Sequence, residues 1–418
     1  MQRFTESPLV NQPTKADRGV GRSPGRLPHI LQWMLPGLFA LALGCALWQN
    51  AGVDSNGWLA LGGIFAVFSM FSFRNSGSFW PLLLPLGCIT LQLLPTPAHT
   101  MAAGLTVLQL ARVAIYLVSF AVAREIAARR PSWAWILLAI PSAFGCAEAI
   151  YGISQHAIRG EDNYAVGTFP EHGHFAGFIE LLLPVSIAAV WRYRHPLAIA
   201  TPLLFLAALL HSFSRAALVA TALAIVAMVL MRTRQFKLTG AAALVLMLTG
   251  LVLAPSGLGE RFDRISTFAG FSHDAHVKRW QDTVRMIEAR PILGSGAGTY
   301  PVAFPFYNTS SSHGPADHAD NDYLQLLAEI GIAGTLSILA LFAIALGRYI
   351  RAARWSLAAL GAAGAMIALL AHSLFEFQMY IPANVLTLSW IAGVGWGATM
   401  NPPSWPTAKR LGTGSASN

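Results

Sequence analysis

Long apolar runs recur along almost the whole of this 418-residue chain, and they constrain its fold more than any other feature. A helix needs about 20 apolar residues to cross the roughly 30 Å hydrocarbon core of a bilayer, because each residue rises about 1.5 Å. Twelve runs are seen, several of them short for a complete crossing, at 31–49, 57–72, 79–94, 100–123, 132–153, 173–191, 196–211, 215–231, 238–254, 323–346, 356–374 and 380–399. The pattern predicts an all-α, polytopic integral membrane protein with about twelve transmembrane helices.

The charge content agrees with a lipid environment. Only 11% of the residues are charged, against about 25% in typical soluble proteins. The net charge of +9 does not indicate a nucleic-acid partner, because most Lys and Arg residues fall in short loops between the apolar runs. The three cysteines, Cys45, Cys88 and Cys146, lie within apolar runs, so they indicate neither a disulfide framework nor a metal site.

The distribution of Lys and Arg predicts the orientation, because these residues concentrate in cytoplasmic loops. With the N-terminus in the cytoplasm, a twelve-span arrangement places most of the 28 Lys and Arg residues on the cytoplasmic side, and the opposite loops near 50–56 and 95–99 contain none. We therefore expect a disordered basic cytoplasmic tail at 1–28, a transmembrane domain at 29–400 and a second cytoplasmic tail at 401–418.

One outer loop, about 255–322 between the ninth and tenth spans, is unusually long, and loops of this length usually carry function. Within it, the segment from Asp274 to Arg290 has the spacing of an amphipathic helix that Pro291 ends. Its apolar side consists of Val277, Trp280, Val284 and Ile287. The simplest interpretation is a helix that lies on the membrane surface.

Unusual polar residues gather at the outer ends of the expected spans, although they are far apart in the sequence. They are His172, His174, His211, Arg215, His318, Asp320, Asp322, His372 and Glu376. Each has a structural alternative: a histidine at a helix end often only satisfies backbone groups, and Asp322 with Gln325 fits a capping box. Asp320 or Asn321 would also serve as a simple helix cap.

Two arginines are harder to explain as ordinary surface residues. Arg215 opens an apolar helix on the side where arginine is disfavoured. Arg112 lies near the middle of the fourth span, where a charge costs at least about 2.5 kcal/mol and should face a partner or a polar cavity. Glu148 and Glu180, in other spans, are candidate partners in a structural ion pair.

Several segments resemble the O-antigen ligase and O-antigen polymerase superfamily. They are Gly167 to Pro184, His211 to Leu218, Arg279-Trp280, Pro291 to Tyr300 and His318 to Gly334. The segment from His372 to Leu388 is similar to a subgroup that includes exopolysaccharide polymerases. Their order and their shared membrane face strengthen the resemblance, which covers roughly residues 160–390.

The resemblance implies a chemistry. Members of the superfamily take a glycan from a polyprenyl (undecaprenyl) diphosphate lipid and attach it to an acceptor hydroxyl, on the periplasmic side of the bacterial inner membrane. The acceptor is a lipid A core sugar in ligases and a growing glycan in polymerases. The resemblance implies an inverting glycosyltransferase that uses no metal and no cofactor. Its expected partners are the lipid-linked donor, the acceptor and membrane lipid.

The resemblance also suggests roles for individual residues. Arg215 and Arg279 match arginines of the family and would bind the donor diphosphate, for which a planar, permanently charged guanidinium is suited. His318, with Asp320 close by, is the expected catalytic base for the acceptor hydroxyl. Further candidate substrate-binding residues are His172, His174, Asn321, His372, Glu376 and Arg112.

The chain departs from the family pattern at the expected base. Many relatives have histidine immediately before the asparagine that corresponds to Asn321, whereas this chain has Asp320. The base is therefore His318, Asp320 or the two together. If His318 acts with an unperturbed imidazole, activity should fall as the pH drops through about 6.5.

Two other functions compete with glycan transfer. A transporter or flippase of lipid-linked saccharides would be expected to place polar residues near the midplane of the membrane, as Arg112 suggests. A metal-dependent enzyme would use His318, Asp320 and a loop histidine such as His313. The pattern does not separate a ligase from a polymerase, because only the acceptor differs.

Overall fold

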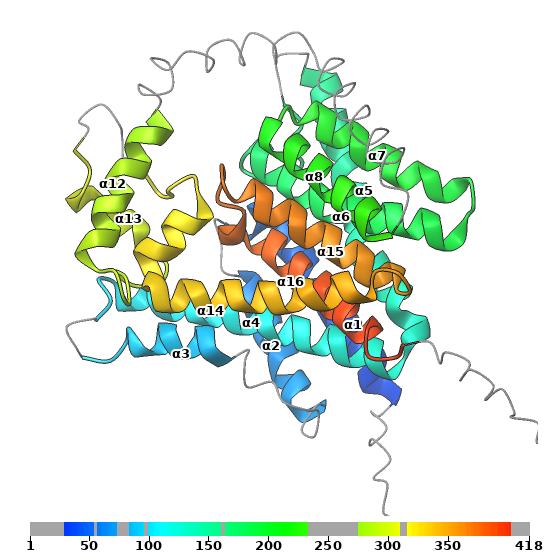
Figure 1. Ribbon diagram of the computed structural model, residues 1–418, viewed down its shortest axis with the longest axis horizontal. Coiled ribbons are helices and arrows are strands. Elements are labelled where there is room, and N and C mark those ends of the chain that lie inside the picture. Colours follow the sequence, from blue (N-terminus) through cyan, green and yellow to red (C-terminus); the bar gives the residue numbers. More distant parts are fainter. Residues whose placement is uncertain are drawn as a thin grey trace, which may run out of the picture.

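The computed structural model describes residues 29–53, 57–72, 83–95, 99–159, 164–232, 275–309 and 316–402. Helices connected by turns make up these residues, and no strand occurs in them (Figure 1). The α-helices are α1 (His29–Trp48), α2 (Gly57–Ser72), α3 (Leu83–Leu91), α4 (Ala103–Arg129), α5 (Ala134–Arg159), α6 (His172–Tyr193), α7 (Leu197–His211), α8 (Arg215–Arg232), α12 (Ala275–Ala289), α13 (Tyr300–Ala303), α14 (Asp322–Ala352), α15 (Leu357–His372) and α16 (Pro382–Ala398).

The all-helical prediction is confirmed over the described residues. Eleven of the twelve apolar runs correspond to helices, and the run at 238–254 lies outside the described residues. Five helical segments are long and apolar enough to cross a membrane, namely α4, Pro131–Ile158, α6, α8 and α14. The number of crossings and the periplasmic position of the long loop stay predictions.

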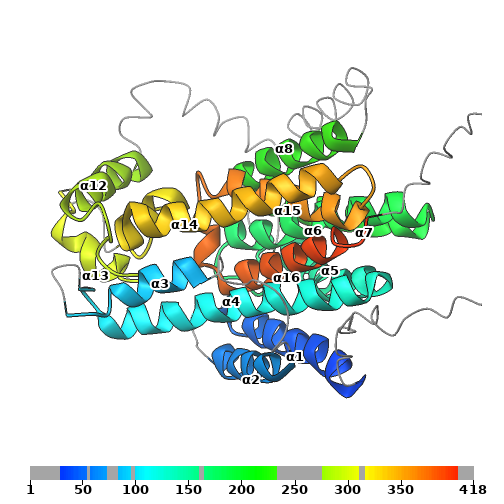
Figure 2. The same ribbon diagram turned by 60° about the horizontal axis from the view of Figure 1, so that its bottom comes forward.

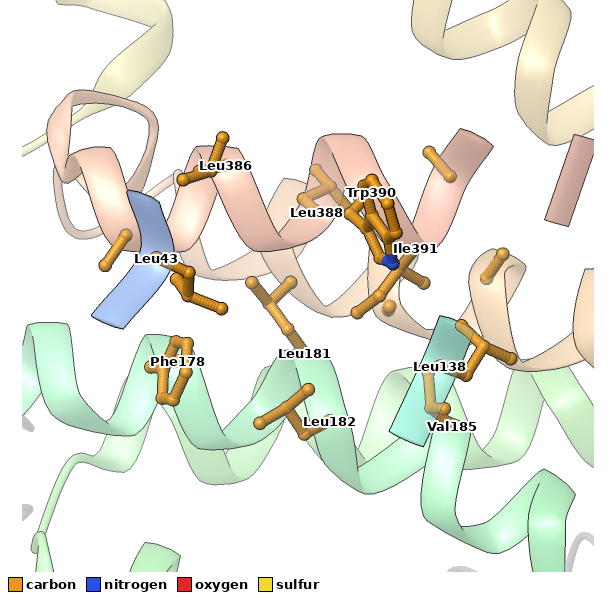
Figure 3. Close-up of a cluster of buried hydrophobic side chains, with 14 of the residues drawn as sticks. Leu43, Leu138, Phe178, Leu181, Leu182, Val185, Leu386, Leu388, Trp390 and Ile391 are labelled. Atoms are coloured by element: carbon orange, nitrogen blue, oxygen red, sulfur yellow. The ribbon is translucent and has the colours of Figure 1, made fainter. Parts of the chain in front are cut away.

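Helix α6 lies at the centre of the bundle. It packs against α5, α7, α8, α15 and α16, and its side chains from Gly173 to Ser186 are buried. Figure 3 shows Leu181 of α6 pointing toward Leu388 and Ile391 of α16, whereas Leu182 lies against Gly145 of α5. Trp390 of α16 completes this core: its ring stacks on Phe39 at 3.9 Å, and its indole N–H donates to the Leu137 carbonyl at 2.9 Å.

Small residues let α16 approach α4 closely. A side-chain carbon added at Gly393 would lie 2.3 Å from the Phe120 carbonyl oxygen, and one at Gly397 would lie 2.3 Å from the Arg124 carbonyl oxygen. Glycines four residues apart share one helix face. In membrane proteins, such a face lets the backbones of two helices approach each other closely. Figure 2 shows α4 and α16 running alongside one another.

The glycine-rich turn at 294–298 secures the first part of α14. The Glu329 carboxylate accepts hydrogen bonds from the backbone N–H groups of Gly298 and Tyr300, at 2.7 and 2.9 Å. A side chain at Gly294 would collide with the Glu329 backbone, and Gly294 also has a φ of +70°, so glycine is required there on both counts. The turn thus binds an internal carboxylate and fixes the segment that follows α12.

Helix α12 confirms the predicted amphipathic helix to within one residue at each end, but it is held by protein rather than lying free on a membrane surface. It packs against α14, and Figures 1 and 2 both show α12 and α13 at one end of α14. Asp282, Thr283 and Met286 are buried, whereas Val284 of the expected apolar side is 41% exposed. The helix therefore also has a packing role, because it buries polar residues against α13 and the loop that follows, and its position relative to the membrane stays a prediction.

Candidate functional site

The predicted gathering of polar residues is present at one end of the bundle. The start of α6, the end of α15, the start of α14 and the start of α12 contribute to it. His174 interacts electrostatically with His172, His318, His372 and Asp320. Arginines lie in the last turns of α4, α6, α8 and α14, at the opposite ends of these helices. The division agrees with the orientation predicted from the positive charges.

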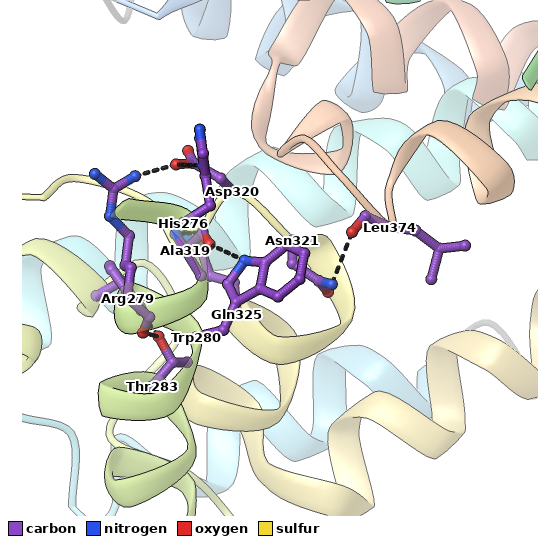
Figure 4. Close-up of polar contacts among 10 residues, drawn as sticks. His276, Arg279, Trp280, Thr283, Ala319, Asp320, Asn321, Gln325 and Leu374 are labelled. Carbon is purple, nitrogen blue, oxygen red and sulfur yellow. Dashed lines mark hydrogen bonds and ion pairs between the residues drawn. The ribbon is translucent and has the colours of Figure 1, made fainter. Parts of the chain in front are cut away.

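Asp320 is held by two cationic or basic side chains of α12. The Arg279 guanidinium and the His276 imidazole both contact its Oδ2 atom, His276 through Nδ1 at 2.8 Å, as Figure 4 shows around α12. Asp320 has a φ of +53°, a left-handed conformation that aspartate tolerates better than most residues. Its side chain is only 12% exposed, so the carboxylate is withdrawn from bulk water into contact with α12.

The ring of His318 is held by stacking against one aromatic ring and by a hydrogen bond at one nitrogen. It stacks on Phe377 at 4.0 Å with an interplanar angle of 15°. The Ala319 N–H donates to Gln325 Oε1 at 3.0 Å, which leaves Gln325 Nε2 facing His318 Nδ1 at 3.0 Å. An amide N–H can only donate, so Nδ1 accepts and the neutral imidazole carries its proton on Nε2.

The same surroundings keep His318 neutral. Burial lowers the pKa of His318 to about 4, and the nearby Asp317 and Asp320 carboxylates oppose this only in part. The lowered pKa moves any loss of activity that depends on protonation of His318 below the pH of about 6.5 expected for an unperturbed imidazole. The neutral form of His318 persists well into the acid range, with Nε2–H as a hydrogen-bond donor.

A buried polar network supports the cluster from behind. His372 Nδ1 lies 3.0 Å from Glu180 Oε1, and both side chains are fully buried. Gln378 donates to the Gly173 carbonyl at 3.0 Å and accepts from Asn384 at 2.7 Å. The network ties the end of α15 and the turn that carries Glu376 and Phe377 to the start of α6.

Glu376 and Glu171 add two more carboxyl groups to the site. Burial, followed by the nearby Asp320 and Glu171 carboxylates, raises the pKa of Glu376 to about 7, although His372 opposes the shift. Burial and then Asp320 also raise the pKa of Glu171. Glu376 lies directly against Gly173, where an added side-chain carbon would come within 2.8 Å of Oε1. A carboxyl group that titrates near neutrality therefore borders the cluster.

The two unusual arginines occupy different parts of this end. Arg112 is the tenth residue of α4, in its first half rather than at its middle, because α4 continues to Arg129. It interacts electrostatically with Tyr116 and His318. Arg215 begins α8, directly after the turn in which the ring of Phe213 meets that of Tyr164. Tyr164 in turn contacts the His172 ring at 4.5 Å, so this turn adjoins the start of α6.

The suggested glutamate partners of Arg112 have other roles. Glu180 pairs with His372, and Glu148 accepts hydrogen bonds from the Thr168 N–H and hydroxyl at 2.9 and 2.8 Å. Both glutamates thus have partners other than Arg112 within the segments that surround α6. His211 fits its structural alternative, since its Nδ1 contacts the Ala207 carbonyl at 2.7 Å.

The start of α14 corrects the capping prediction. Asn321 is the N-cap: its side-chain oxygen accepts from the Leu324 N–H at 3.0 Å, and its amide donates to the Leu374 carbonyl at 2.9 Å. Asp322 is instead fully buried and accepts from the Met379 N–H at 2.9 Å. The capping box was wrong because Gln325 bonds to Ala319 and His318 instead of the cap.

An apolar cavity of about 260 Å³ opens beside the cluster. Helices α3, α4, α14, α15 and α16 line it, mainly with aliphatic and aromatic side chains. Tyr380 and Glu329 are among its few polar lining residues. The Tyr380 ring lies 5.6 Å from that of His318, so the apolar cavity and the polar cluster adjoin.

The sequence interpretation missed His276, Gln325 and Phe377. For His276 a signal was available, because it precedes Arg279 by three residues and such pairs share a helix face. Gln325 and Phe377 contact His318 only through tertiary packing, which no local sequence pattern predicts. No group of three or more His, Cys, Asp or Glu side chains within the described ranges has the arrangement of a metal site.

Residues 200–339 match the family model of O-antigen ligase. The resemblance to the O-antigen ligase and polymerase superfamily is confirmed. The matched segment contains Arg215, Arg279, His318 and Asp320 together with His276, so the family match and the polar cluster overlap. A search of curated proteins finds no match to the chain. The match supports a membrane glycosyltransferase-like enzyme of the ligase or polymerase type.

Proposed function

We propose that the protein transfers a glycan from a polyprenyl diphosphate-linked donor to an acceptor hydroxyl on the periplasmic side of the bacterial inner membrane. The observation that carries the proposal is the contact of Arg279 and His276 with Asp320, beside His318 and an adjoining apolar cavity. A phosphate ligand and proton acceptors then occur together within the segment that matches O-antigen ligase, and a surface suited to lipid adjoins them.

The donor diphosphate binds to Arg215 and Arg279 in this proposal. Negative charge develops on the diphosphate as the glycosidic bond breaks, and guanidinium groups stabilise it in the transition state. The Arg279 side chain is 22% exposed, and its contact with Asp320 fixes the orientation of the guanidinium before the donor binds. No metal or cofactor takes part, and a chelator should leave transfer unchanged.

The lipid part of the donor enters the apolar cavity between α4 and α14. Its lining is compatible with a hydrocarbon chain, and its Tyr380 side contacts His318. His318, neutral and with Nε2–H as donor, would hydrogen-bond a donor oxygen at the junction between lipid and sugar. The arrangement allows a lipid-linked sugar to reach the cluster with its lipid chain still surrounded by apolar groups.

The other candidate substrate-binding residues divide into two groups. Glu376, His172 and Arg112 border the cluster and are proposed to contact the sugars of the donor or acceptor. His174, His372 and Asn321 are proposed to act indirectly, because His174 and His372 are buried and Asn321 caps α14. The base for the acceptor hydroxyl remains His318, Asp320 or a neighbour that one of them positions.

Deletion of the gene, followed by gel analysis of surface polysaccharide, tests this function. We expect loss of ligated or long-chain glycan, restored by the wild-type gene. Normal surface glycan in the deletion strain would reject the proposal. No observation on the described residues favours a flippase, since the titratable cluster lies at one end of the helices.

A further inference from the structure

Two histidines next to Asp320 have complementary hydrogen bonding. His318 accepts at Nδ1 from Gln325, so its Nε2 carries the proton and donates. His276 has its Nδ1 2.8 Å from the Asp320 carboxylate, which can only accept, so Nδ1 carries the proton and Nε2 has the lone pair. Of the two rings, only His276 is arranged to receive a proton at Nε2.

The position of His276 suits an approaching acceptor. Asp320, directly before the N-cap residue Asn321 of α14, contacts an imidazole supplied by α12. The His276 side chain is 55% exposed, so a hydroxyl-bearing acceptor can approach it. His276 lies one helical turn before Arg279, the proposed diphosphate ligand, on the same face of α12.

We propose that His276, oriented by Asp320, is the general base that activates the acceptor hydroxyl. The inference rests on the proposed function. The acceptor oxygen forms a bond to the anomeric carbon, and the bond between that carbon and the diphosphate oxygen breaks. The bonding electron pair leaves with the diphosphate, and the hydroxyl proton passes to His276 Nε2. The Asp320 carboxylate stabilises the imidazolium, as a carboxylate does for histidine in hydrolase triads.

The charged neighbours agree with this assignment. His276 and Arg279 both contact Asp320. Glu376 also interacts electrostatically with His276. Asp320 itself is a poorer base, because Arg279 and His276 both occupy its Oδ2 atom. Its role is to fix the tautomer and the direction of the His276 ring.

Rescue by a small base tests the proposal in the complemented deletion strain. His276→Ala and His276→Gln should each lower the initial rate of glycan transfer by about 10²-fold or more, the usual contribution of a general base. Added imidazole, which reaches the periplasm, should restore much of the rate in His276→Ala, because the truncation leaves room for it. It should not restore His276→Gln, whose side chain fills the space.

The matched control is His99→Ala, since His99 is an exposed histidine whose backbone carbonyl accepts from Arg290 just after α12. This variant should keep wild-type transfer and show no response to imidazole. Full activity of His276→Gln, or a folded His276→Ala that imidazole does not rescue, would overturn the assignment. If the wild-type gene itself failed to restore surface glycan, the proposed function would fail instead.

Discussion

Replacing Gly393 by alanine tests whether close packing of α16 on α4 holds the bundle together. The added methyl carbon would lie 2.3 Å from the Phe120 carbonyl oxygen and 2.8 Å from the Ala123 side chain. Ordinary contacts begin near 3.4 Å, so the two helices must separate locally by about 1 Å. Backbone atoms cannot turn aside as a flexible side chain would, and overpacking of this kind costs about 1–3 kcal/mol.

The matched control is Gly63→Ala in α2, where nothing lies within 4 Å of an added carbon. Alanine is favoured over glycine inside a helix by about 1 kcal/mol, so this control should be neutral or stabilising. Stability would be measured by titrating the purified protein with SDS and following helicity by circular dichroism. The packing argument is refuted if Gly393→Ala is as stable as Gly63→Ala.

Three further predictions concern the site and its orientation. Arg215→Lys and Arg279→Lys keep the charge but lose the planar fork, so both should fold normally and lose most glycan transfer; an active Arg279→Lys would make that residue structural. With the native cysteines removed, Glu288→Cys should react with an impermeant maleimide in intact spheroplasts, and Arg351→Cys should react only after permeabilisation; the reverse pattern would invert the topology. The raised pKa of Glu376, about 7, means that the folded protein favours the protonated carboxyl, whose stabilising contribution is lost as the pH rises from about 4.5 through 7. Glu376→Gln should therefore be more stable than the wild type at pH 8 in thermal unfolding, with the difference shrinking at pH 5, and equal stability at both pH values would contradict the burial of this group.

Hydropathy was sufficient to predict the helices because each apolar run is a local signal. The amphipathic helix α12 was also readable, to within a residue at each end, from the spacing of Val277 and Trp280. Because successive loops alternate between the two membrane faces, the sequence also predicted that His172, His318 and His372 lie at the same end of the bundle. The structure agrees because topology alone determines which helix ends are neighbours.

The pairings within that end could not be predicted, because they join residues far apart in the chain. Glu180 pairs with His372 across 192 positions, although Arg112 looked like the better partner from charge alone. The tautomer of His318 depends on Gln325, which the pattern had placed in a capping box. These details need side-chain packing, which hydrophobic periodicity does not encode.

In the proposed function, this protein consumes a lipid-linked glycan after that glycan has reached the outer face of the membrane. The most direct measurement is the leaflet in which the lipid-linked donor accumulates when the gene is deleted. Digestion of intact spheroplasts with an impermeant glycosidase should release the accumulated glycan, because transfer is blocked after the donor has crossed the membrane. Donor that resists digestion until the spheroplasts are permeabilised would lie on the cytoplasmic side, which would contradict glycan transfer and indicate a flippase.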